Sequence, residues 1–285
     1  MEKNDKAAIK ALLRRHGFHF SKSMGQNFLI NPDVPAAIAE SSRADETNGV
    51  LEVGPGIGAL SSQLCRRAGK VVAVELDKTL LPILDETMAN FDNFEVVSAD
   101  ILKTDISALV REKFAGLTPI VCANLPYNIT TPAITALIES KCFESITVLV
   151  QKEVAERLCA KPGTSAYGAF SVFMQYYTEP ELLFEVPKEN FEPMPKVTSA
   201  VLRAVVREKP PVEVADEAFF FKTVYAAFAL RRKTLVNSLM TVFGQQFTKE
   251  ELTQIIVDCG LDANVRGEKL GLSEFAALSA ILKNH

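Results

Sequence analysis

Residues 50–60, Val-Leu-Glu-Val-Gly-Pro-Gly-Ile-Gly-Ala-Leu, constrain the fold of this chain of 285 residues more than any other stretch. An apolar run that ends in closely spaced glycines and continues into an apolar-periodic segment predicts a buried strand, a tight turn and a helix. Gly54, Gly56 and Gly58 can adopt backbone angles that other residues avoid, so a ligand can approach the main chain closely. The first N–H groups of the following helix also lack intrahelical partners. The sequence therefore predicts a ligand-binding turn in an α/β protein.

The next predicted strand indicates the kind of ligand. Residues 71–74 are Val-Val-Ala-Val, and Glu75 follows them, at a place where an acidic side chain binds ribose hydroxyls in nucleotide-binding sheets. The turn itself fits two cofactors. Its first two glycines and Ala59 match the G-x-G-x-x-A pattern of NAD-binding proteins, which is a weak motif by itself, whereas E-x-G-x-G-x-G from Glu52 is more similar to S-adenosylmethionine (SAM) methyltransferases. A turn that only packs a helix on a strand is the simpler alternative.

Composition narrows the class of protein. Apolar residues make up 48% of the chain, enough for the cores of one large and one small domain. The net charge of −4 argues against a uniformly basic nucleic-acid binder, so RNA contacts would need local patches. The five cysteines are widely spaced without a C-x-x-C pair, which argues against disulfides and a zinc site. No apolar run reaches the length of a membrane span and no signal peptide is recognisable, so we expect a cytoplasmic protein outside membranes.

The N-terminal 25 residues form a candidate RNA-facing arm, because they carry six basic and two acidic side chains. A helix with Ile9, Leu12 and Leu13 packed inward and its charges in solvent explains this pattern equally well. Asn27 follows the arm, and its short amide can both donate and accept hydrogen bonds. The simpler interpretation of Asn27 is a cap for the helix expected after Pro32.

Two further strands are predicted to bring polar side chains to the same sheet edge. Residues 94–97 form the third strand, and Asp100 follows it where open parallel sheets bind ligands. A carboxylate there can accept a hydrogen bond from an adenine amine, or it can only cap the helical turn that begins at Ile101. Residues 119–123 form the fourth strand and lead into the tetrapeptide 124–127, Asn-Leu-Pro-Tyr.

This tetrapeptide has the groups needed to hold a planar base by its exocyclic amine. Asn124 offers a side-chain carbonyl, the peptide before Pro126 is held extended so that the Leu125 carbonyl can point outward, and Tyr127 offers an aromatic face. Two acceptors for the hydrogens of an adenine N6 favour a pyramidal nitrogen and aim its lone pair, so that alignment can promote methyl transfer without a general base. The base would have to be unstacked or flipped. A polar turn is the alternative.

A second aromatic side chain is a candidate for the other face of the base. Phe191 lies in the loop 190–197, which Pro193 and Pro195 stiffen. Its ring could stack on a base that Tyr127 already holds. The alternative is that Phe191 fills a local core.

The C-terminal part is predicted to be a separate helical domain. Lys-Pro-Pro at 209–211 has the composition of a linker, so we expect a catalytic domain over 1–208 and a small helical domain over 209–285. Arg231, Arg232 and Lys233 follow the first expected helix of that domain. They form a compact cationic site suited to phosphates, or simply a solvated helix end.

Several of these motifs, in this order, resemble the ribosomal RNA adenine N6-dimethyltransferase family. The resemblance runs from Gly25 to Leu278 and takes in two C-terminal signatures as well. The motifs that carry it are Gly25-Gln26-Asn27-Phe28-Leu29, the E-x-G-x-G-x-G turn, Asp100, Asn124-Leu125-Pro126-Tyr127, Phe191-x-Pro193-x-Pro195-Lys196-Val197, Arg231-Arg232-Lys233-Thr234-Leu235 and Arg266-x-Glu268-x-Leu270.

The resemblance implies a Rossmann-like fold with a seven-stranded, mostly parallel sheet, a late antiparallel strand and an all-helical C-terminal domain. It implies an enzyme that uses SAM to dimethylate N6 of two adjacent adenines near the 3′ end of 16S rRNA in the immature small subunit. The residues it assigns to the target adenine are Asn124, Leu125, Pro126, Tyr127 and Phe191. Those it assigns to SAM are Asn27, Leu29, Gly54, Gly56, Glu75, Asp100, Ile101 and Asn124, and those it assigns to RNA are Arg231, Arg232 and Lys233.

Three other functions stay open from the sequence. A large-subunit rRNA methyltransferase of the antibiotic-resistance type would share most motifs, although such enzymes are usually more basic. An assembly factor that acts mainly by binding the pre-ribosome would need the basic surfaces more than the base pocket. NAD-dependent oxidation is the least supported, because no His or Lys stands at a suitable position. We expect a monomer without a metal and without DNA as a partner.

Overall fold

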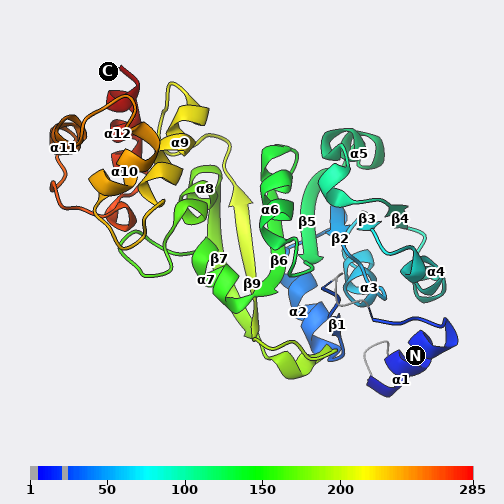
Figure 1. Cartoon of the computed structure of the whole chain (residues 1–285). Helices are drawn as coiled ribbons and strands as arrows, with labels where there is room; N and C mark the ends of the chain where they lie inside the picture. Colours follow the sequence, from blue (N-terminus) through cyan, green and yellow to red (C-terminus); the bar gives the residue numbers. More distant parts are fainter. Residues whose placement is uncertain (1–5, 21–24, 285) are drawn as a thin grey trace. The chain divides into compact units, whose positions relative to one another are not determined.

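The computed structural model describes residues 6–20 and 25–284, and the chain divides into two compact units (Figure 1). The first unit comprises Met1–Ala155 and Glu181–Val206, and the second comprises Glu156–Pro180 and Arg207–His285. The part of the predicted basic arm at 1–5 and 21–24 lies outside the described residues.

A seven-stranded sheet forms the centre of the first unit, in the order β4-β3-β2-β5-β6-β9-β7. Strands β2 to β6 pair in parallel, and β9 runs antiparallel to β6. This arrangement confirms the predicted fold class. The strands are β2 (Asn48–Val53), β3 (Lys70–Glu75), β4 (Phe94–Ser98), β5 (Thr118–Asn124), β6 (Ser145–Gln151), β7 (Thr178–Val186) and β9 (Ser199–Val206).

Both faces of the central strands are buried, which explains why these strands are continuous apolar runs rather than alternating ones. On one face Val50, Ile120 and Leu149 pack against Ile38 of α2 and Leu64 of α3. The helices of the first unit are α1 (Lys6–Arg15), α2 (Asp33–Ser41), α3 (Ala59–Cys65), α4 (Leu81–Met88), α5 (Ile106–Lys113) and α6 (Thr130–Glu139), with the 3₁₀ turns η2 (Lys78–Leu80), η3 (Ile101–Lys103) and η4 (Lys188–Asn190). The boundary between the units falls within α7 (Lys152–Leu158).

A second, two-stranded sheet joins two motifs that are far apart in the sequence. Strand β1 (Phe28–Leu29) pairs antiparallel with β8 (Phe191–Glu192). Neither strand is predicted from the sequence, because two residues are too few to show a period. The pairing places the proline-stiffened loop next to the segment that contains Asn27.

Helix α1 has the packing expected of an amphipathic helix. Its Ile9, Leu12 and Leu13 are buried in a cluster with Phe18, Phe28, Ile57, Leu80 and Ile83. The charged face of α1 is also engaged. Lys6 and Lys10 place their Nζ atoms 2.9 Å and 3.3 Å from the carboxylate of Glu192, and Arg15 pairs with Glu86.

The second unit is helical, as expected, and has its own core. Its helices are α8 (Ala169–Tyr177), α9 (Glu217–Ala227), α10 (Leu235–Phe243), α11 (Lys249–Asp258) and α12 (Leu272–Asn284), with the 3₁₀ turn η5 (Gly267–Lys269). Phe220, Leu239, Phe243 and Phe275 are fully buried in its core. No helix among the described residues is long and apolar enough to cross a membrane.

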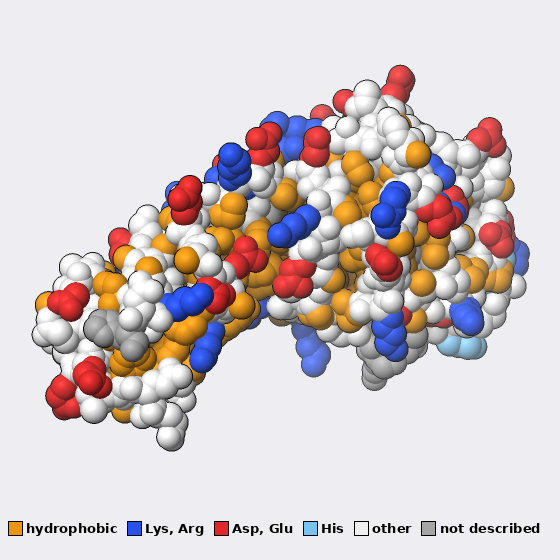
Figure 2. Space-filling model, turned by 90° about the horizontal axis from the view of Figure 1, so that it is seen from above, with side chains coloured by type: hydrophobic (Ala, Val, Ile, Leu, Met, Phe, Trp, Pro, Cys, Tyr) orange, Lys and Arg blue, Asp and Glu red, His pale blue; other side chains and the backbone are white. Residues whose placement is uncertain are grey.

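The unit boundaries differ from the predicted division at 208/209 in two respects. The late boundary lies two residues earlier, after Val206, and the segment 156–180, which was expected in the first domain, belongs to the second unit. The reason is aromatic packing: Tyr176 of α8 lies 5.2 Å from Phe220 of α9, and Phe173 lies 5.6 Å from Phe221, measured between ring centroids. Basic and acidic side chains are interspersed over the surface drawn in Figure 2, as the small net charge suggests.

Candidate cofactor and substrate site

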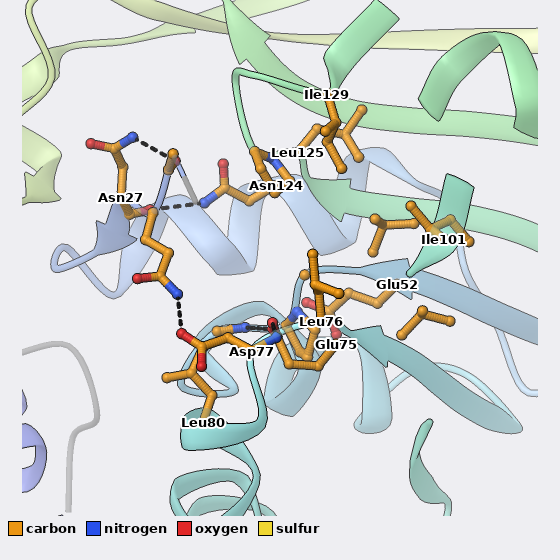
Figure 3. A pocket seen from close by; sticks show the side chains of 18 of the residues that line it. Asn27, Glu52, Glu75, Leu76, Asp77, Leu80, Ile101, Asn124, Leu125 and Ile129 are labelled. Carbon is orange, nitrogen blue, oxygen red and sulfur yellow. Dashed lines mark hydrogen bonds between the residues drawn. The ribbon is translucent and has the colours of Figure 1, made fainter. Parts of the chain in front are cut away.

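A cavity of about 170 Å³ lies at the carboxyl ends of β2, β3, β4 and β5, where open parallel sheets bind ligands. All the predicted cofactor residues and the whole tetrapeptide 124–127 line this cavity, although they come from segments far apart in the sequence. Figure 3 shows Asn27, Glu75 and Asn124 among them. Its lining segments are residues 25–29, 52–57, 59–60, 74–77, 80, 99–102 and 124–129.

The glycine turn needs its glycines. Gly54, Gly56 and Gly58 have φ angles of 69°, 59° and 81°, in the left-handed region that other residues rarely adopt. Space is limiting as well. A Cβ atom on Gly58 would lie 2.8 Å from Sδ of Met88, and one on Gly56 would lie 3.0 Å from the ring of Phe28. The turn can therefore pass close to a ligand while α3 begins directly behind it.

Glu75 is held in place by the turn that follows β3. Its Oε1 atom accepts a hydrogen bond from the Asp77 N–H (2.8 Å), and its Oε2 atom accepts one from the Gly56 N–H (3.4 Å). The side chain is 6% exposed, and burial raises the pKa of its carboxyl above the ordinary value. The carboxylate oxygens are thus oriented at the cavity wall, and binding of a ribose by Glu75 stays a prediction.

Glu52 is the most buried acidic side chain of the site, at 1% exposure. Burial raises the pKa of its carboxyl to about 8, the Ser61 hydroxyl lowers it, and nearby Glu75 raises it further. Its Oε2 atom has no hydrogen-bond partner among the described residues. In the sequence Glu52 is only the first residue of the glycine motif, although an acidic residue inside an apolar strand is itself a signal.

Asp100 caps the turn η3, because its Oδ1 atom accepts a hydrogen bond from the Leu102 N–H (3.0 Å). It also lines the cavity, so a contact with an adenine amine stays a prediction. Next to it, Leu76 and Leu102 are 51% and 40% exposed although they are large apolar residues. Exposed apolar side chains beside a carboxylate suit a planar ring with an amine. Sequence reasoning missed both leucines.

Asn27 and Asn124 are hydrogen-bonded to each other across the cavity. The Nδ2 group of Asn124 donates to the Asn27 carbonyl (3.2 Å), which leaves the side-chain carbonyl of Asn124 as an acceptor (Figure 3). The Nδ2 group of Asn27 donates to the Gly25 carbonyl (3.1 Å). The alternative that Asn27 caps α2 is wrong. The side chain that accepts a hydrogen bond at the start of α2 is that of Asn31, whose Oδ1 accepts from the Asp33 N–H (3.1 Å).

Two more polar residues that the sequence analysis did not single out stabilise the rim. The Nε2 group of Gln26 donates to Oδ2 of Asp77 (2.8 Å), and Oδ1 of Asp77 accepts from the Thr79 N–H (3.0 Å). This bond links the segment before β1 to the turn after β3, so Asp77 connects two walls of the cavity. These two segments are far apart in the sequence and meet only in the folded chain, so no local sequence pattern could have predicted this hydrogen bond.

Tyr127 lines the cavity beside Asn124, and its hydroxyl forms a hydrogen bond of 2.6 Å with Oγ of Ser199 on β9. Burial raises the pKa of this hydroxyl. Leu125 is buried at 1% exposure, and its N–H donates to the Leu149 carbonyl (3.1 Å). The tetrapeptide is therefore anchored at both ends to the sheet.

Phe191 does not line the cavity in this structure. Its side chain is 1% exposed and belongs to the core cluster that includes Leu29 and Val201. The structure thus shows the core-filling arrangement, because pairing of β8 with β1 turns this ring inward. Stacking of Phe191 on a base stays a prediction and would require β8 to move.

Arg231, Arg232 and Lys233 lie in the second unit, in the turn between α9 and α10, and all three are exposed. The guanidinium of Arg231 donates to the Ser165 carbonyl within the same unit. Tyr225, on α9 shortly before them, is 56% exposed. An exposed aromatic ring close to a basic run in the sequence is a composition suited to nucleic acid.

The charge of the cavity indicates what it can bind. Four acidic residues line it, whereas no Lys, Arg or His is among its described lining residues. The floor holds a carboxyl oxygen without a hydrogen-bond partner among the described residues, and the wall holds oriented carboxylates. Together with the glycines at the turn, these groups fit a cationic nucleoside cofactor such as SAM. The acidic residues are Glu52, Glu75, Asp77 and Asp100.

Comparisons with solved structures agree with this fold. A dimethyladenosine transferase from Plasmodium falciparum superposes with a TM-score of 0.74 at 22% identity and covers 90% of this chain and 98% of that one. The 23S rRNA methyltransferase ErmE superposes with a TM-score of 0.68 at 25% identity and covers 90% of this chain and 99% of that one.

Proteins found by sequence comparison are more similar to this chain than these two solved structures are. A ribosomal RNA small subunit methyltransferase A of Geobacillus sp. (strain WCH70) is 46% identical over 278 residues, which are 96% of each chain. The protein of the same name from Bacillus cereus (strain B4264) is 48% identical over 279 residues, 97% of this chain and 96% of that one. The family model described as ribosomal RNA adenine dimethylase matches residues 17–278. This match covers nearly the whole chain, and the motifs of the family line the cavity. The chain therefore belongs to the ribosomal RNA adenine dimethylase family.

Proposed function

We propose that this protein transfers methyl groups from SAM to N6 of two adjacent adenines near the 3′ end of 16S rRNA, giving N6,N6-dimethyladenosines during ribosome biogenesis. The observation that carries the proposal is the convergence of Glu75, Asp100 and the tetrapeptide 124–127 on one cavity. The names of the closely similar relatives support the small subunit as the substrate rather than the large one.

The cofactor half of the cavity uses oriented acceptors. Glu75 would accept hydrogen bonds from the ribose hydroxyls, and Asp100 would accept one from the adenine amine. Backbone groups of the glycine turn would contact the amino-acid part. When bound, SAM supplies a methyl group that its sulfonium charge already activates. The residues that would hold it are Asn27, Leu29, Gly54, Gly56, Glu75, Asp100, Ile101 and Asn124.

The substrate half uses the tetrapeptide. The side-chain carbonyl of Asn124 and the backbone carbonyl of Leu125 would accept the two hydrogens of the adenine N6, while Pro126 keeps the preceding peptide extended. Tyr127 would stack on the base and Phe191 would cover its other face after β8 has moved. Alignment of the nitrogen replaces a general base, and the product nitrogen loses its proton to water.

Binding to the ribosomal particle would use basic surfaces outside the cavity. Arg231, Arg232 and Lys233 would contact phosphates of 16S rRNA, so the helical domain at 209–285 would serve mainly in RNA binding. The substrate would be the immature 30S subunit in the cytoplasm, and the enzyme would act as a monomer because the particle already supplies a large partner surface.

The experiment that tests this proposal is methyl transfer from labelled SAM to small ribosomal subunits that lack adenine dimethylation, followed by nucleoside mass spectrometry. We expect dimethyladenosine at two adjacent positions. Modification of large-subunit RNA instead would replace the proposal by the resistance-type activity. Binding of SAM and of the particle without any methylated nucleoside would show an assembly factor that acts by binding.

The Asn124→Ala variant tests the arrangement of acceptors. It should reduce the methyl-transfer rate by at least about 100-fold, because the target nitrogen loses its alignment, while the particle still binds. Asn90→Ala is the matched control, since Asn90 is exposed and lies outside the cavity. A rate within about twofold of the wild type in Asn124→Ala would contradict the assigned role.

A further inference from the structure

Glu52 is a buried acid for which the proposed methyl transfer has no use. It lies on β2 with Ala73 of β3 as its register neighbour, and its side chain is 1% exposed. The Oε2 atom lacks a hydrogen-bond partner among the described residues. Glu52 and Glu75 lie close together on the floor of the cavity (Figure 3).

A carboxyl group in this position is far more stable neutral than charged. The side chain is almost completely buried, no cationic side chain of the described residues pairs with it, and the carboxylate of Glu75 is nearby. Burial therefore raises the pKa of Glu52 to about 8, so the carboxyl keeps its proton at neutral pH. Native proteins rarely leave such a group without a partner unless it has a functional use.

The neighbouring elements offer no compensating charge. Glu75 faces Glu52 from β3, and the uncharged Ser61 hydroxyl faces it from α3. Cys122 faces it from β5, and burial raises the pKa of this thiol, so it stays neutral too. Ser42 of the adjoining segment interacts with Cys122 and carries no charge. Among the residues that the structure describes, none of these neighbours brings a positive charge to Glu52, so a bound cationic ligand would supply one.

We propose that Glu52 is a charge-sensing residue that holds a proton in the free protein and releases it to solvent when a cationic cofactor binds. The carboxylate that results favours SAM, which has a sulfonium charge, over the product S-adenosylhomocysteine, whose thioether is neutral. Glu52 thereby contributes to specificity for the cofactor and to release of the product. No bond other than the O–H bond of the carboxyl is broken. This inference rests on the proposed function, since it takes SAM as the cofactor.

The sign of the pH dependence follows from linkage. Below about pH 8 the free protein holds the proton and the complex with SAM does not, so binding releases a proton and affinity rises with pH. Above about pH 8 both forms are ionised and the affinity levels off. One linked proton changes the affinity by at most about tenfold per pH unit. Binding of S-adenosylhomocysteine should show a weaker pH dependence.

Isothermal titration calorimetry with the full chain tests this directly. SAM and S-adenosylhomocysteine are each titrated between pH 6 and 9 in buffers of different ionisation enthalpy, which gives the number of protons released. We expect up to one proton with SAM and clearly fewer with S-adenosylhomocysteine. Glu52→Gln should abolish the release, flatten the pH profile and reduce the preference for SAM by about tenfold. Glu112→Gln is the matched control, because this glutamate is 69% exposed on α5.

A second measurement does not depend on the variant. Infrared difference spectroscopy of the wild type should show loss of the carbonyl band of a protonated carboxyl when SAM binds. Proton release that persists in Glu52→Gln would assign it to Glu75 and overturn the proposal, and so would SAM binding without release or without the infrared change. If SAM does not bind at all, the proposed function fails as well, whereas methyl transfer without proton release would overturn only the inference about Glu52.

Discussion

Tyr127 contributes two separable groups to the cavity, a ring and a hydroxyl, and their contributions can be measured separately. Tyr127→Phe keeps the ring but removes the hydrogen bond to Ser199, which should cost about 1 kcal/mol, or about fivefold in kcat/KM. Tyr127→Ala also removes the ring that we propose stacks on the base, which is worth about 1–3 kcal/mol, so kcat/KM should fall by about 30-fold or more. Steady-state methyl transfer to small subunits measures both.

Ser199→Ala serves as the control for the hydroxyl. If the hydrogen bond acts as one unit, Ser199→Ala and Tyr127→Phe should have similar effects, and the double variant should be no worse than either. Additive effects would show that the hydroxyl of Tyr127 acts on the substrate instead of on Ser199.

Residues whose place follows from a strand end could be predicted from the sequence. Glu75 and Asp100 come just after apolar runs, and parallel strands deliver such residues to one edge. Asp77 and Leu102 line the same cavity but could not be found, because their positions depend on the shape of the turns. The burial of Phe191 was one of two alternatives, and only the β1–β8 pairing distinguishes them.

Helix α1 connects two parts of the first unit, the cavity wall and strand β8. Its apolar face packs on Phe28, Ile57 and Leu80, which also line the cavity. Its Lys6 and Lys10 pair with Glu192, the residue that follows Phe191. These ion pairs are partly exposed and each contributes under about 1 kcal/mol. The apolar contacts therefore hold α1 in place, and the charges set where it attaches to β8.

Ile9→Ala should detach α1 rather than unfold the protein. Ile9 is 1% exposed, and removing such a side chain costs about 2–5 kcal/mol, more than a short helix can lose while staying docked. We expect amide protection to disappear over 6–15 and SAM affinity to fall, because the cavity wall loses its support. Hydrogen exchange and calorimetry measure the two effects.

The exposed Ala11 on the same helix provides the control variant Ala11→Ser. It should leave protection and affinity close to those of the wild type. Loss of protection over the whole first unit in Ile9→Ala would mean that α1 belongs to the cooperative core and is not a separately docked element.

The larger elements could be predicted because their apolar patterns are long. Strands β2 to β5 of the main sheet coincide with predicted apolar runs, and the helical character of the chain after residue 216 was expected as well. The assignment of α8 to the second unit was not expected. Its sequence shows a buried helix, but which core buries Phe173 and Tyr176 depends on aromatic partners that come from α9.

At the scale of the whole molecule, RNA binding has to be reconciled with a net charge of −4. A particle with a dense phosphate surface repels such a protein on average, so local basic sites must orient it. Several basic residues of the described chain are neutralised internally, including Lys6, Lys10 and Arg15. Arg232 and Lys233 are exposed in the second unit, which leaves their charges available to RNA.

Arg232→Gln and Lys233→Gln should therefore weaken binding to the small subunit without changing SAM affinity, because the cavity residues belong to the other unit. Each lost phosphate contact should reduce the slope of log affinity against log salt by about 0.7–1. Arg231 is left intact, since its bond to the Ser165 carbonyl would mix a structural effect with the RNA contact. Lys249→Gln, an exposed lysine at the start of α11, is the matched control. Filter binding at several salt concentrations measures the slopes. An equal change in the control would mean that overall charge, rather than this site, directs the enzyme to RNA.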